Sequence, residues 1–319
     1  MRTVIAAVCL GFLLCISMHG RLLAHQPEVL RESGVDKTGA TGVLPSETDP
    51  RITAFNKLHF IWLPKGVPRN QLLVFLPGTG GAPNAHMSFA VTAQRLGYHV
   101  ISLMYPDAVA AQTACGWSRD PDAHIKFRLA IIRGGNFERL HVSRIDSIEG
   151  RLAALLRYVI AHQPNRGWTQ FYNQARGIEW NKVCVSGASQ GGGHAYIIAK
   201  YHPVSRVIML ASPKDYSLYF QRPPKGFDSN TQTPIGRMFA FNHVRDNGNG
   251  CTHAQQRKTL QQMGMTRLGI AEIEKAGPDF NHAHVLYTDV SLPTRTYHGS
   301  VLKRRFERVW IYMLTEKVD

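Results

Sequence analysis

The feature that most restricts the fold of this chain is a regular alternation of short apolar runs with longer segments of helical periodicity. The apolar runs lie at 58–63, 72–76, 98–104, 182–185, 206–210, 238–242 and 284–287. The helical patterns lie at 85–96, 145–161, 190–201, 253–263 and 300–314. Most of the apolar runs are apolar at consecutive positions, which is typical of strands buried on both faces. The alternation predicts an α/β fold, with a mostly parallel central sheet flanked by helices.

The N-terminal residues 1–24 differ in composition from the rest of the chain. Arg2 supplies a positive start, an apolar run follows, and Ala24 offers a small residue for cleavage. These are the parts of a secretory signal peptide, which predicts a secreted or periplasmic protein. The run is shorter than the roughly 20 residues that cross a bilayer, so no stable membrane insertion is expected after cleavage. Lipidation at Cys15 stays open, although Leu14 stands where a lipoprotein signal has a small residue.

The remaining chain divides into a short leader and one domain. Residues 25–51 are polar without sustained periodicity and are predicted to be an extended N-terminal leader. Residues 52–319 show no repeat and no low-complexity linker, which predicts a single domain. Two insertions, 107–142 and 216–233, follow strands. Because ligands in open α/β sheets bind beyond the carboxyl ends of the strands, these insertions are expected to form a substrate-facing cap.

The net charge of +15 is strongly positive, with 37 Lys and Arg against 22 Asp and Glu. The basic residues are scattered, and the densest group, 303–305, falls within a helical pattern, so a solvated face is favoured and no nucleic-acid partner is expected. Four basic residues in the first insertion favour an acidic or hydroxyl-rich substrate, with solvated surface as the alternative. They are Arg119, Lys126, Arg128 and Arg133.

A glycine-rich segment, Gly187-Ala-Ser189-Gln190-Gly191, stands between the apolar run 182–185 and the helical pattern 190–201. Gly-x-Ser-x-Gly between a strand and a helix is typical of a nucleophile elbow, a strained turn that raises the serine above the sheet. Side chains at positions 187 and 191 would clash with the crossing backbone. A phosphate-binding turn is the alternative, but no Walker lysine follows. The segment predicts Ser189 as a nucleophile.

A serine hydroxyl needs a base to remove its proton, and the chain offers 15 histidines. After an elbow of this kind the acid and then the histidine follow along the chain, with the histidine beyond the last strand. His298 lies between the apolar run 284–287 and the final helical pattern, and is the predicted base. Asp246, after the run 238–242, is the predicted acid. Asp215, after the run 206–210, stays open as the alternative acid.

Acyl transfer also needs hydrogen-bond donors for the oxyanion that forms on the attacked carbonyl. The Gly-rich segment 78–81 follows an early apolar run, where backbone N–H groups can point into a site. Thr79, with Gly80 next, and Gln190, which follows Ser189, are the predicted donors.

The cysteine count bears on disulfide bonding in an exported protein. Removal of Cys9 and Cys15 with the signal peptide leaves three cysteines, so at least one is unpaired. Cys184 lies in an apolar run where a thiol packs well, whereas the other two lie near glycines. A Cys115–Cys251 disulfide is therefore expected.

These motifs resemble the α/β-hydrolase superfamily over residues 52 to the C-terminus. A narrower set is similar to secreted polyhydroxybutyrate depolymerases and to feruloyl and acetylxylan esterases, which usually carry Ala where Gln190 stands. That set consists of Tyr105-Pro106, 114–117 (Ala-Cys-Gly-Trp), 133–135 (Arg-Gly-Gly) and 189–192 (Ser-Gln-Gly-Gly). The resemblance implies an esterase that acts on polymer-derived or carbohydrate esters.

The sequence thus predicts a secreted serine esterase that forms an acyl-enzyme at Ser189 and acts on a small or polymer-derived ester. This chemistry requires no metal and no cofactor. Two alternatives stay open: a non-catalytic binding protein on a hydrolase scaffold, and a serine acyltransferase.

Overall fold

The computed structural model describes residues 38–293 and 296–318, and the statements below concern this part of the chain. The predicted signal peptide, Cys15 and residues 25–37 of the predicted leader lie outside the described residues. The described residues belong to one compact unit. None of their helices is both long enough and apolar enough to span a bilayer.

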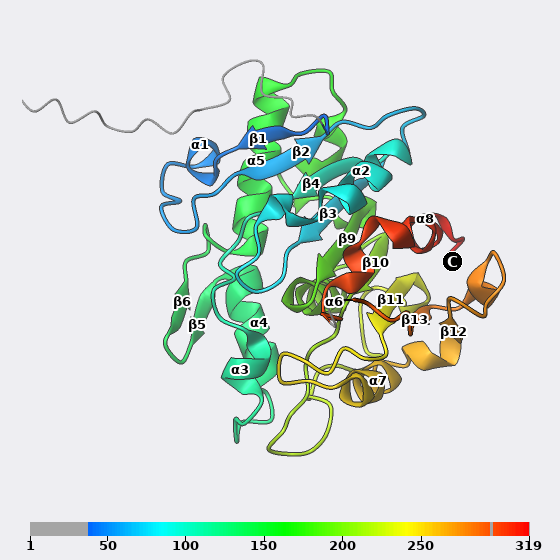
Figure 1. The fold of residues 1–319 in the computed structure, drawn as a ribbon. Helices are drawn as coiled ribbons and strands as arrows, with labels where there is room; N and C mark the ends of the chain where they lie inside the picture. The colour runs from blue at the N-terminus through cyan, green and yellow to red at the C-terminus, as the bar shows by residue number, and fades with distance from the viewer. Residues whose placement is uncertain (1–37, 294–295, 319) are drawn as a thin grey trace, which may run out of the picture. The chain divides into compact units, whose positions relative to one another are not determined.

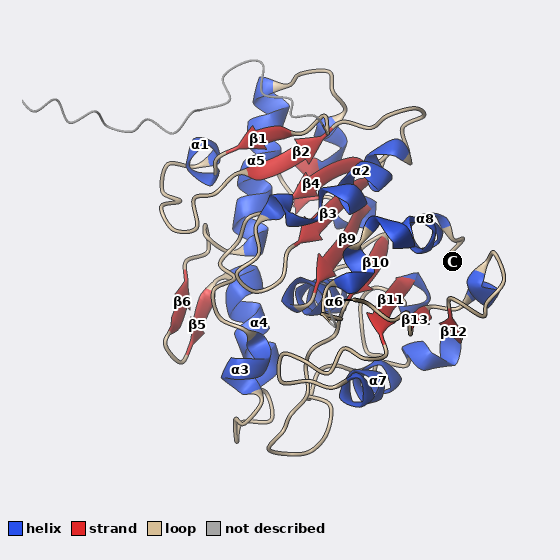
Figure 2. Cartoon of the chain, viewed as in Figure 1, coloured by secondary structure: helices blue, strands red, loops and turns tan. Residues whose placement is uncertain are grey.

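Nine strands of the described chain form one sheet in the order β1-β2-β4-β3-β9-β10-β11-β13-β12 (Figures 1 and 2). The pairs β1–β2 and β2–β4 are antiparallel, and every other pair is parallel, which confirms the predicted mostly parallel sheet. In chain order the strands are β1 (Thr41–Val43), β2 (His59–Trp62), β3 (Leu72–Leu76), β4 (His99–Ser102), β9 (Val183–Ala188), β10 (Arg206–Leu210), β11 (Met238–His243), β12 (Ile270–Glu272) and β13 (Val285–Thr288).

Helices cover both faces of this sheet (Figure 1). Alternate residues of the central strands enter two separate hydrophobic clusters, for example Leu72 and Val74 on one face and Leu73 and Phe75 on the other. The first face packs against α4 (Ala123–Arg133), α5 (Ile148–His162) and α6 (Gln190–Tyr201), and the second against α2 (Met87–Arg95) and α8 (Glu307–Thr315). The consecutive apolar residues of these strands are explained by burial on both faces.

The insertion 107–142 contains α3 (Ala111–Cys115), α4 and a small hairpin of β5 (Gly135–Phe137) and β6 (Leu140–Val142). A second hairpin, β7 (Tyr172–Asn173) with β8 (Gly177–Ile178), precedes β9. The helix α7 (His253–Gln262) begins at a capping box in which Thr252 accepts a hydrogen bond from the Gln255 N–H. The predicted helix 300–314 is shorter than expected, since 300–302 and 304–306 are single 3₁₀ turns and α8 begins only at Glu307.

The sheet begins earlier than the sequence pattern indicates. The strand β1 and the short helix α1 (Pro45–Thr48) lie inside 25–51, which was predicted to be an extended leader. β1 pairs with β2, so this part of the predicted leader belongs to the domain. The pattern missed β1 and β12 because each is a three-residue edge strand, too short to show a periodicity.

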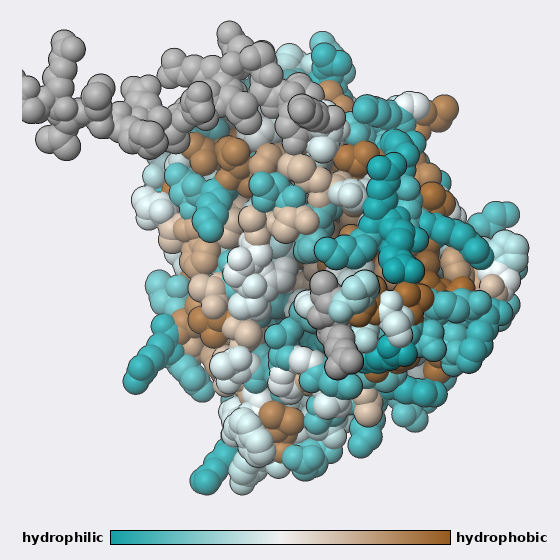
Figure 3. Space-filling view, in the orientation of Figure 1, coloured by the Kyte–Doolittle hydropathy of each residue, from teal (hydrophilic) through white to brown (hydrophobic). Residues whose placement is uncertain are grey.

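The basic group 303–305 lies on the surface between α2 and α8. Its three side chains are exposed, and Arg304 forms an ion pair with Glu307, which also binds Arg95. In Figure 3, hydrophilic side chains predominate over these two helices. The group is a solvated surface that is partly balanced by an acidic residue.

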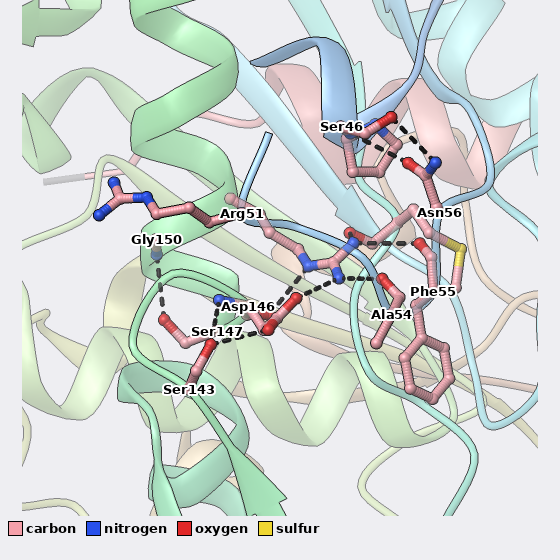
Figure 4. Close-up of polar contacts among 12 residues, drawn as sticks. Ser46, Arg51, Ala54, Phe55, Asn56, Ser143, Asp146, Ser147 and Gly150 are labelled. Carbon is pink, nitrogen blue, oxygen red and sulfur yellow. Dashed lines mark hydrogen bonds and ion pairs between the residues drawn. The ribbon is translucent and has the colours of Figure 1, made fainter. Parts of the chain in front are cut away.

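A buried arginine fixes the segment before β2 to α5. Arg151 is fully buried and donates hydrogen bonds to the carbonyls of Ala54 (2.6 Å) and Phe55 (3.1 Å), and it forms an ion pair with Asp146 (2.8 Å). Figure 4 shows these two carbonyls and the Asp146 carboxylate converging on one guanidinium group. Only an arginine presents enough donors in a plane for this arrangement.

We expect Arg151→Met to lower the free energy of unfolding by about 3 kcal/mol, because it leaves a carboxylate and two carbonyls without their buried partner. Urea unfolding followed by circular dichroism measures this change. The control is Arg176→Met, which removes a 2.7 Å pair with Glu179 in which the arginine side chain is 71% exposed. The control should cost less than about 0.5 kcal/mol. Equal effects of the two variants would contradict the role of burial.

Candidate active site

The turn between β9 and α6 has the geometry of a nucleophile elbow. Ser189 lies between Ala188 and Gln190 with φ 53° and ψ −117°, a backbone conformation that a residue with a side chain rarely adopts. A Cβ atom on Gly187 would lie 2.2 Å from the carbonyl carbon of Gly191, and one on Gly191 would lie 2.0 Å from the Leu76 oxygen. The structure therefore bears out the predicted clash, and both positions require glycine.

Ser189 opens into a cavity of about 550 Å³ at the carboxyl ends of the parallel strands. His298, Thr79 and Gln190, three of the predicted site residues, line the same cavity. The other lining residues are Gly78, Gly81, His86, Ala110, Ala111, Gln112, Thr113, Arg128, Ala188, Ala211, Lys214, Asn249, Gly299 and Leu302. The first insertion contributes several of them, but the insertion 216–233 contributes none, so only the first acts as a cap over this cavity.

Asp246 and His298 are hydrogen-bonded to each other. Asp246 Oδ2 lies 2.9 Å from His298 Nδ1, and the carboxylate is almost completely buried. Burial raises the pKa of Asp246, but the hydrogen bond from His298 and the charge of Lys214 outweigh it and leave the pKa below its ordinary value. An ionised carboxylate only accepts hydrogen bonds, so Nδ1 carries the proton. The other ring nitrogen, Nε2, has no partner among the described residues and can accept a proton from a hydroxyl group.

Asp215, the alternative acid, is bound elsewhere. Its two oxygens accept hydrogen bonds from Arg128 Nε (2.8 Å) and Nη2 (2.7 Å), and both side chains are fully buried. The remaining nitrogen of Arg128 donates to the Gln190 carbonyl (2.9 Å), which fixes the first turn of α6. Of the two carboxylates, the structure thus places Asp246 beside His298, and the alternative that names Asp215 is wrong because Arg128 occupies its carboxylate.

Two of the three predicted oxyanion donors are free. The backbone N–H groups of Thr79 and Gln190 have no acceptor within the described part of the chain. The N–H of Gly80 donates to the Asp107 carbonyl (3.0 Å), so the prediction for Gly80 is wrong. The Gln190 side-chain oxygen accepts hydrogen bonds from the Ala111 N–H (2.8 Å) and the Thr79 hydroxyl (3.2 Å). Gln190 therefore ties the loop 78–81 and α3 to the elbow.

The predicted Cys115–Cys251 disulfide is also wrong. Cys115, Cys184 and Cys251 are all free and buried. Burial raises the pKa of Cys251 to about 12 and that of Cys115 still further, so both remain neutral thiols. The packing argument that kept Cys184 unpaired applies to all three cysteines, because Cys115 at the end of α3 and Cys251 before α7 are as buried as Cys184 in β9.

The basic residues of the first insertion do not offer free charge to the cavity. Lys126 pairs with Asp120 (2.6 Å), Arg133 with Glu149 (3.5 Å), and the guanidinium of Arg119 lies over the Tyr219 ring. Arg128, the member of this group that lines the cavity, is neutralised by Asp215. The expected preference for an acidic substrate is therefore not supported.

Sequence reasoning missed several side chains of the cavity, including Lys214, His86, Thr113 and Asn249. Lys214 and Asn249 follow β10 and β11, and the position beyond a parallel strand was the signal that could have identified them. Burial and the charge of Lys303 lower the pKa of His86 to about 4, so its imidazole is neutral. No three His, Cys, Asp or Glu side chains of the described residues form a group that could hold a metal ion.

The strand order, with two antiparallel strands preceding a parallel sheet and the serine elbow after a central strand, defines the α/β-hydrolase fold. No protein-family model and no curated protein sequence matches the chain.

Solved structures with a similar chain path include an alpha-beta serine hydrolase homologue from Coxiella burnetii. It is 13% identical, with 81% of this chain and 92% of that chain covered and a TM-score of 0.44. A dienelactone hydrolase from Anabaena variabilis is 14% identical over 85% of this chain and 96% of its own, with a TM-score of 0.42. An acetyl xylan esterase from Aspergillus awamori is 14% identical over 70% of this chain and 78% of its own, with a TM-score of 0.39.

The two carboxylates should respond differently to neutralisation. In the folded protein, Asp246→Asn should slow covalent labelling of Ser189 by a fluorophosphonate about 10³–10⁴-fold, because the imidazole loses its orienting acceptor. Asp215→Asn should cost about 3 kcal/mol of stability by leaving Arg128 buried and unpaired, yet the folded variant should label within about threefold of the wild type. The measurement is the labelling rate of each variant, corrected for its folded fraction. A loss of labelling rate in Asp215→Asn alone would contradict the assignment of Asp246 as the acid.

Proposed function

We propose that this chain is a serine hydrolase that cleaves carboxylic esters through an acyl-enzyme at Ser189. The observation that carries the proposal is the 2.9 Å contact between Asp246 and His298 at the cavity into which the strained Ser189 opens. The free N–H groups of Thr79 and Gln190 line the same cavity and supply the donors that acyl transfer needs.

The reaction follows from these positions. Ser189 Oγ attacks the ester carbonyl carbon while His298 Nε2 takes the hydroxyl proton. The negative charge that forms on the carbonyl oxygen is stabilised by the N–H groups of Thr79 and Gln190. When the carbon–oxygen bond of the ester breaks, His298 returns the proton to the departing alcohol. Water, activated by the same imidazole, then releases the acid and restores Ser189. Asp246 holds the imidazole in one tautomer throughout.

The lining of the cavity favours a small, uncharged ester that carries hydroxyl groups. Ala110, Ala111, Ala188 and Ala211 form much of the apolar wall. The two buried cations of the lining, Arg128 and Lys214, are each neutralised by an aspartate. Three neutral polar side chains, those of His86, Thr113 and Asn249, also face the cavity and have no hydrogen-bond partner in the described residues. Neutral donors and acceptors recognise hydroxyl groups better than they recognise a carboxylate.

The intact Asp246–His298 pair favours the proposal over one of the two alternatives, the non-catalytic binding protein. A non-catalytic binding protein would not need a buried carboxylate aligned on a histidine, whereas an ester hydrolase does. An acyltransferase would use the same residues, and the two are separated by the products formed when a competing alcohol is added. Export remains a prediction that is supported by the pattern of residues 1–24.

The proposal is tested by labelling with a fluorophosphonate, which reacts with an activated serine. The wild type should be labelled at Ser189, and Ser189→Ala should abolish labelling because no other nucleophile occupies the elbow. Ser88→Ala, a substitution at an exposed serine of α2, is the matched control and should label as the wild type does. A folded wild-type protein that is not labelled would contradict the proposal.

The substrate class is tested with nitrophenyl esters that differ in charge and length. The kcat/KM value for the acetate should exceed the values for the hemisuccinate and the decanoate by at least about tenfold. The cavity has no unpaired cation for the charge of the hemisuccinate, and its small alanine walls offer little apolar surface to the chain of the decanoate. An ester with a hydroxylated acyl group, such as the 3-hydroxybutyrate, should equal or exceed the acetate. A preference for the hemisuccinate would show that an unpaired cation reaches the acyl group.

A further inference from the structure

Lys214 is a buried lysine whose ammonium group has a complete set of partners. Its Nζ donates hydrogen bonds to the carbonyl oxygens of Asp246 (3.1 Å), Gly248 (3.2 Å) and Cys251 (2.8 Å), and its side chain is 4% exposed. An ammonium group has three N–H donors, so the three carbonyls use all of them. Lys214 therefore has no donor left for a substrate and no free position from which to act as a base.

The charge of the same ammonium faces Asp246. Nζ lies 2.9 Å from Asp246 Oδ1, the carboxylate oxygen that His298 does not use. This contact is an ion pair, and Oδ1 has no other partner among the described residues. The two oxygens of Asp246 thus face different groups, one the imidazole of His298 and the other the ammonium of Lys214.

We propose that Lys214 is a positioning residue for the Asp246–His298 pair, which it serves by tethering the loop 246–251 and by balancing the charge of Asp246. The inference rests on the proposed function, because it assigns Lys214 to the reaction of Ser189. The loop 246–251 has no helix or strand of its own, and its three carbonyl contacts to Lys214 fix it at the cavity, which Asn249 of the loop lines. Asp246 is held in place from two directions.

The charge acts on the imidazole through Asp246. A carboxylate beside an imidazole favours the protonated ring, and a nearby cation offsets that effect. Lys214 therefore offsets part of the negative charge that Asp246 presents to the imidazole of His298.

The other charged and titratable groups around this pair do not supply the same balance. Asp215, adjacent in sequence, is neutralised by Arg128 of α4. Two neighbours, His253 and Arg257, lie on α7. Cys251 lies on the loop before α7, and His243 lies on β11. Burial lowers the pKa of His253, Cys251 is a neutral thiol, and Arg257 is exposed. Lys214 is the buried cation paired with Asp246 in the described part of the chain.

The test measures the rate at which a fluorophosphonate labels Ser189 as a function of pH, and it needs no knowledge of the natural substrate. Lys214→Gln removes the charge but keeps an amide donor for the loop. We expect its acid limb, where the rate falls as His298 is protonated, to move up by about one pH unit, with a maximal rate reduced at least about tenfold. Lys214→Arg keeps the charge and should keep the acid limb at the wild-type pH.

The matched control is Lys200→Gln. Lys200 ties another loop in a similar way, with Nζ 2.7 Å from Asp228 Oδ1 and 2.6 Å from the Asn230 carbonyl, but it does not line the cavity. Its replacement should leave both the acid limb and the maximal rate unchanged.

An unchanged acid limb in folded Lys214→Gln, or an equal loss of rate in Lys200→Gln, would overturn the inference. If Lys214→Gln does not fold, Lys214→Arg tests whether Lys214 tethers the loop, because a planar guanidinium does not reproduce the three carbonyl contacts. In Lys214→Arg, amide hydrogen exchange in 246–251 should be faster than in the wild type, and labelling of Ser189 should be slower. Wild-type values for both would contradict the proposal that Lys214 tethers the loop. Absence of labelling in the wild type would instead contradict the proposed function.

Discussion

The site depends on a close backbone contact between the elbow and the end of β3. The α-carbon of Gly191 lies so near the Leu76 carbonyl that a Cβ atom would be 2.0 Å from that oxygen. This contact places the first turn of α6 against the loop 78–81, and the Gln190 side chain bonds to that loop at Thr79. The elbow and the proposed oxyanion donors are therefore one unit. The strained conformation of Ser189 is the local cost of this arrangement, and burial of the central strands on both faces stabilises it.

Two buried ion pairs have cations that line the cavity, and each supports a different part of the site. Arg128 of α4, paired with Asp215, donates a hydrogen bond to the Gln190 carbonyl in the first turn of α6, so this pair supports the elbow. Lys214–Asp246 lies at the end of β10 and supports the histidine. A buried pair contributes little net stability compared with apolar residues of the same size, but it is costly to break. Both pairs also leave the cavity without net charge, which is why the strongly basic composition of the chain does not indicate an acidic substrate.

Much of the fold could be predicted because its signals are local. The helix α6 was predicted at 190–201 to the residue, since the glycine-rich turn marks its start and an apolar face continues through it. Ser189, Asp246 and His298 could be proposed from the sequence because each follows a strand, and the structure brings Asp246 and His298 together although His298 lies ten residues beyond β13. The disulfide prediction was wrong because the sequence around Cys115 and Cys251 gives no local sign of how deeply the two thiols are buried. The role of Lys214 could not be predicted, because its partners are backbone carbonyls of a distant loop and carbonyls have no sequence signature.

In the proposed reaction, Ser189 carries an acyl group during turnover. The most direct measurement is mass spectrometry of the protein quenched with acid milliseconds after mixing with nitrophenyl acetate, followed by peptide mapping. We expect a burst of nitrophenolate and one acetyl group on the peptide that contains Ser189, and this acetyl group should be lost as the protein turns over. Ester hydrolysis without an acetylated intermediate, or an acetyl group on a different residue, would contradict the account.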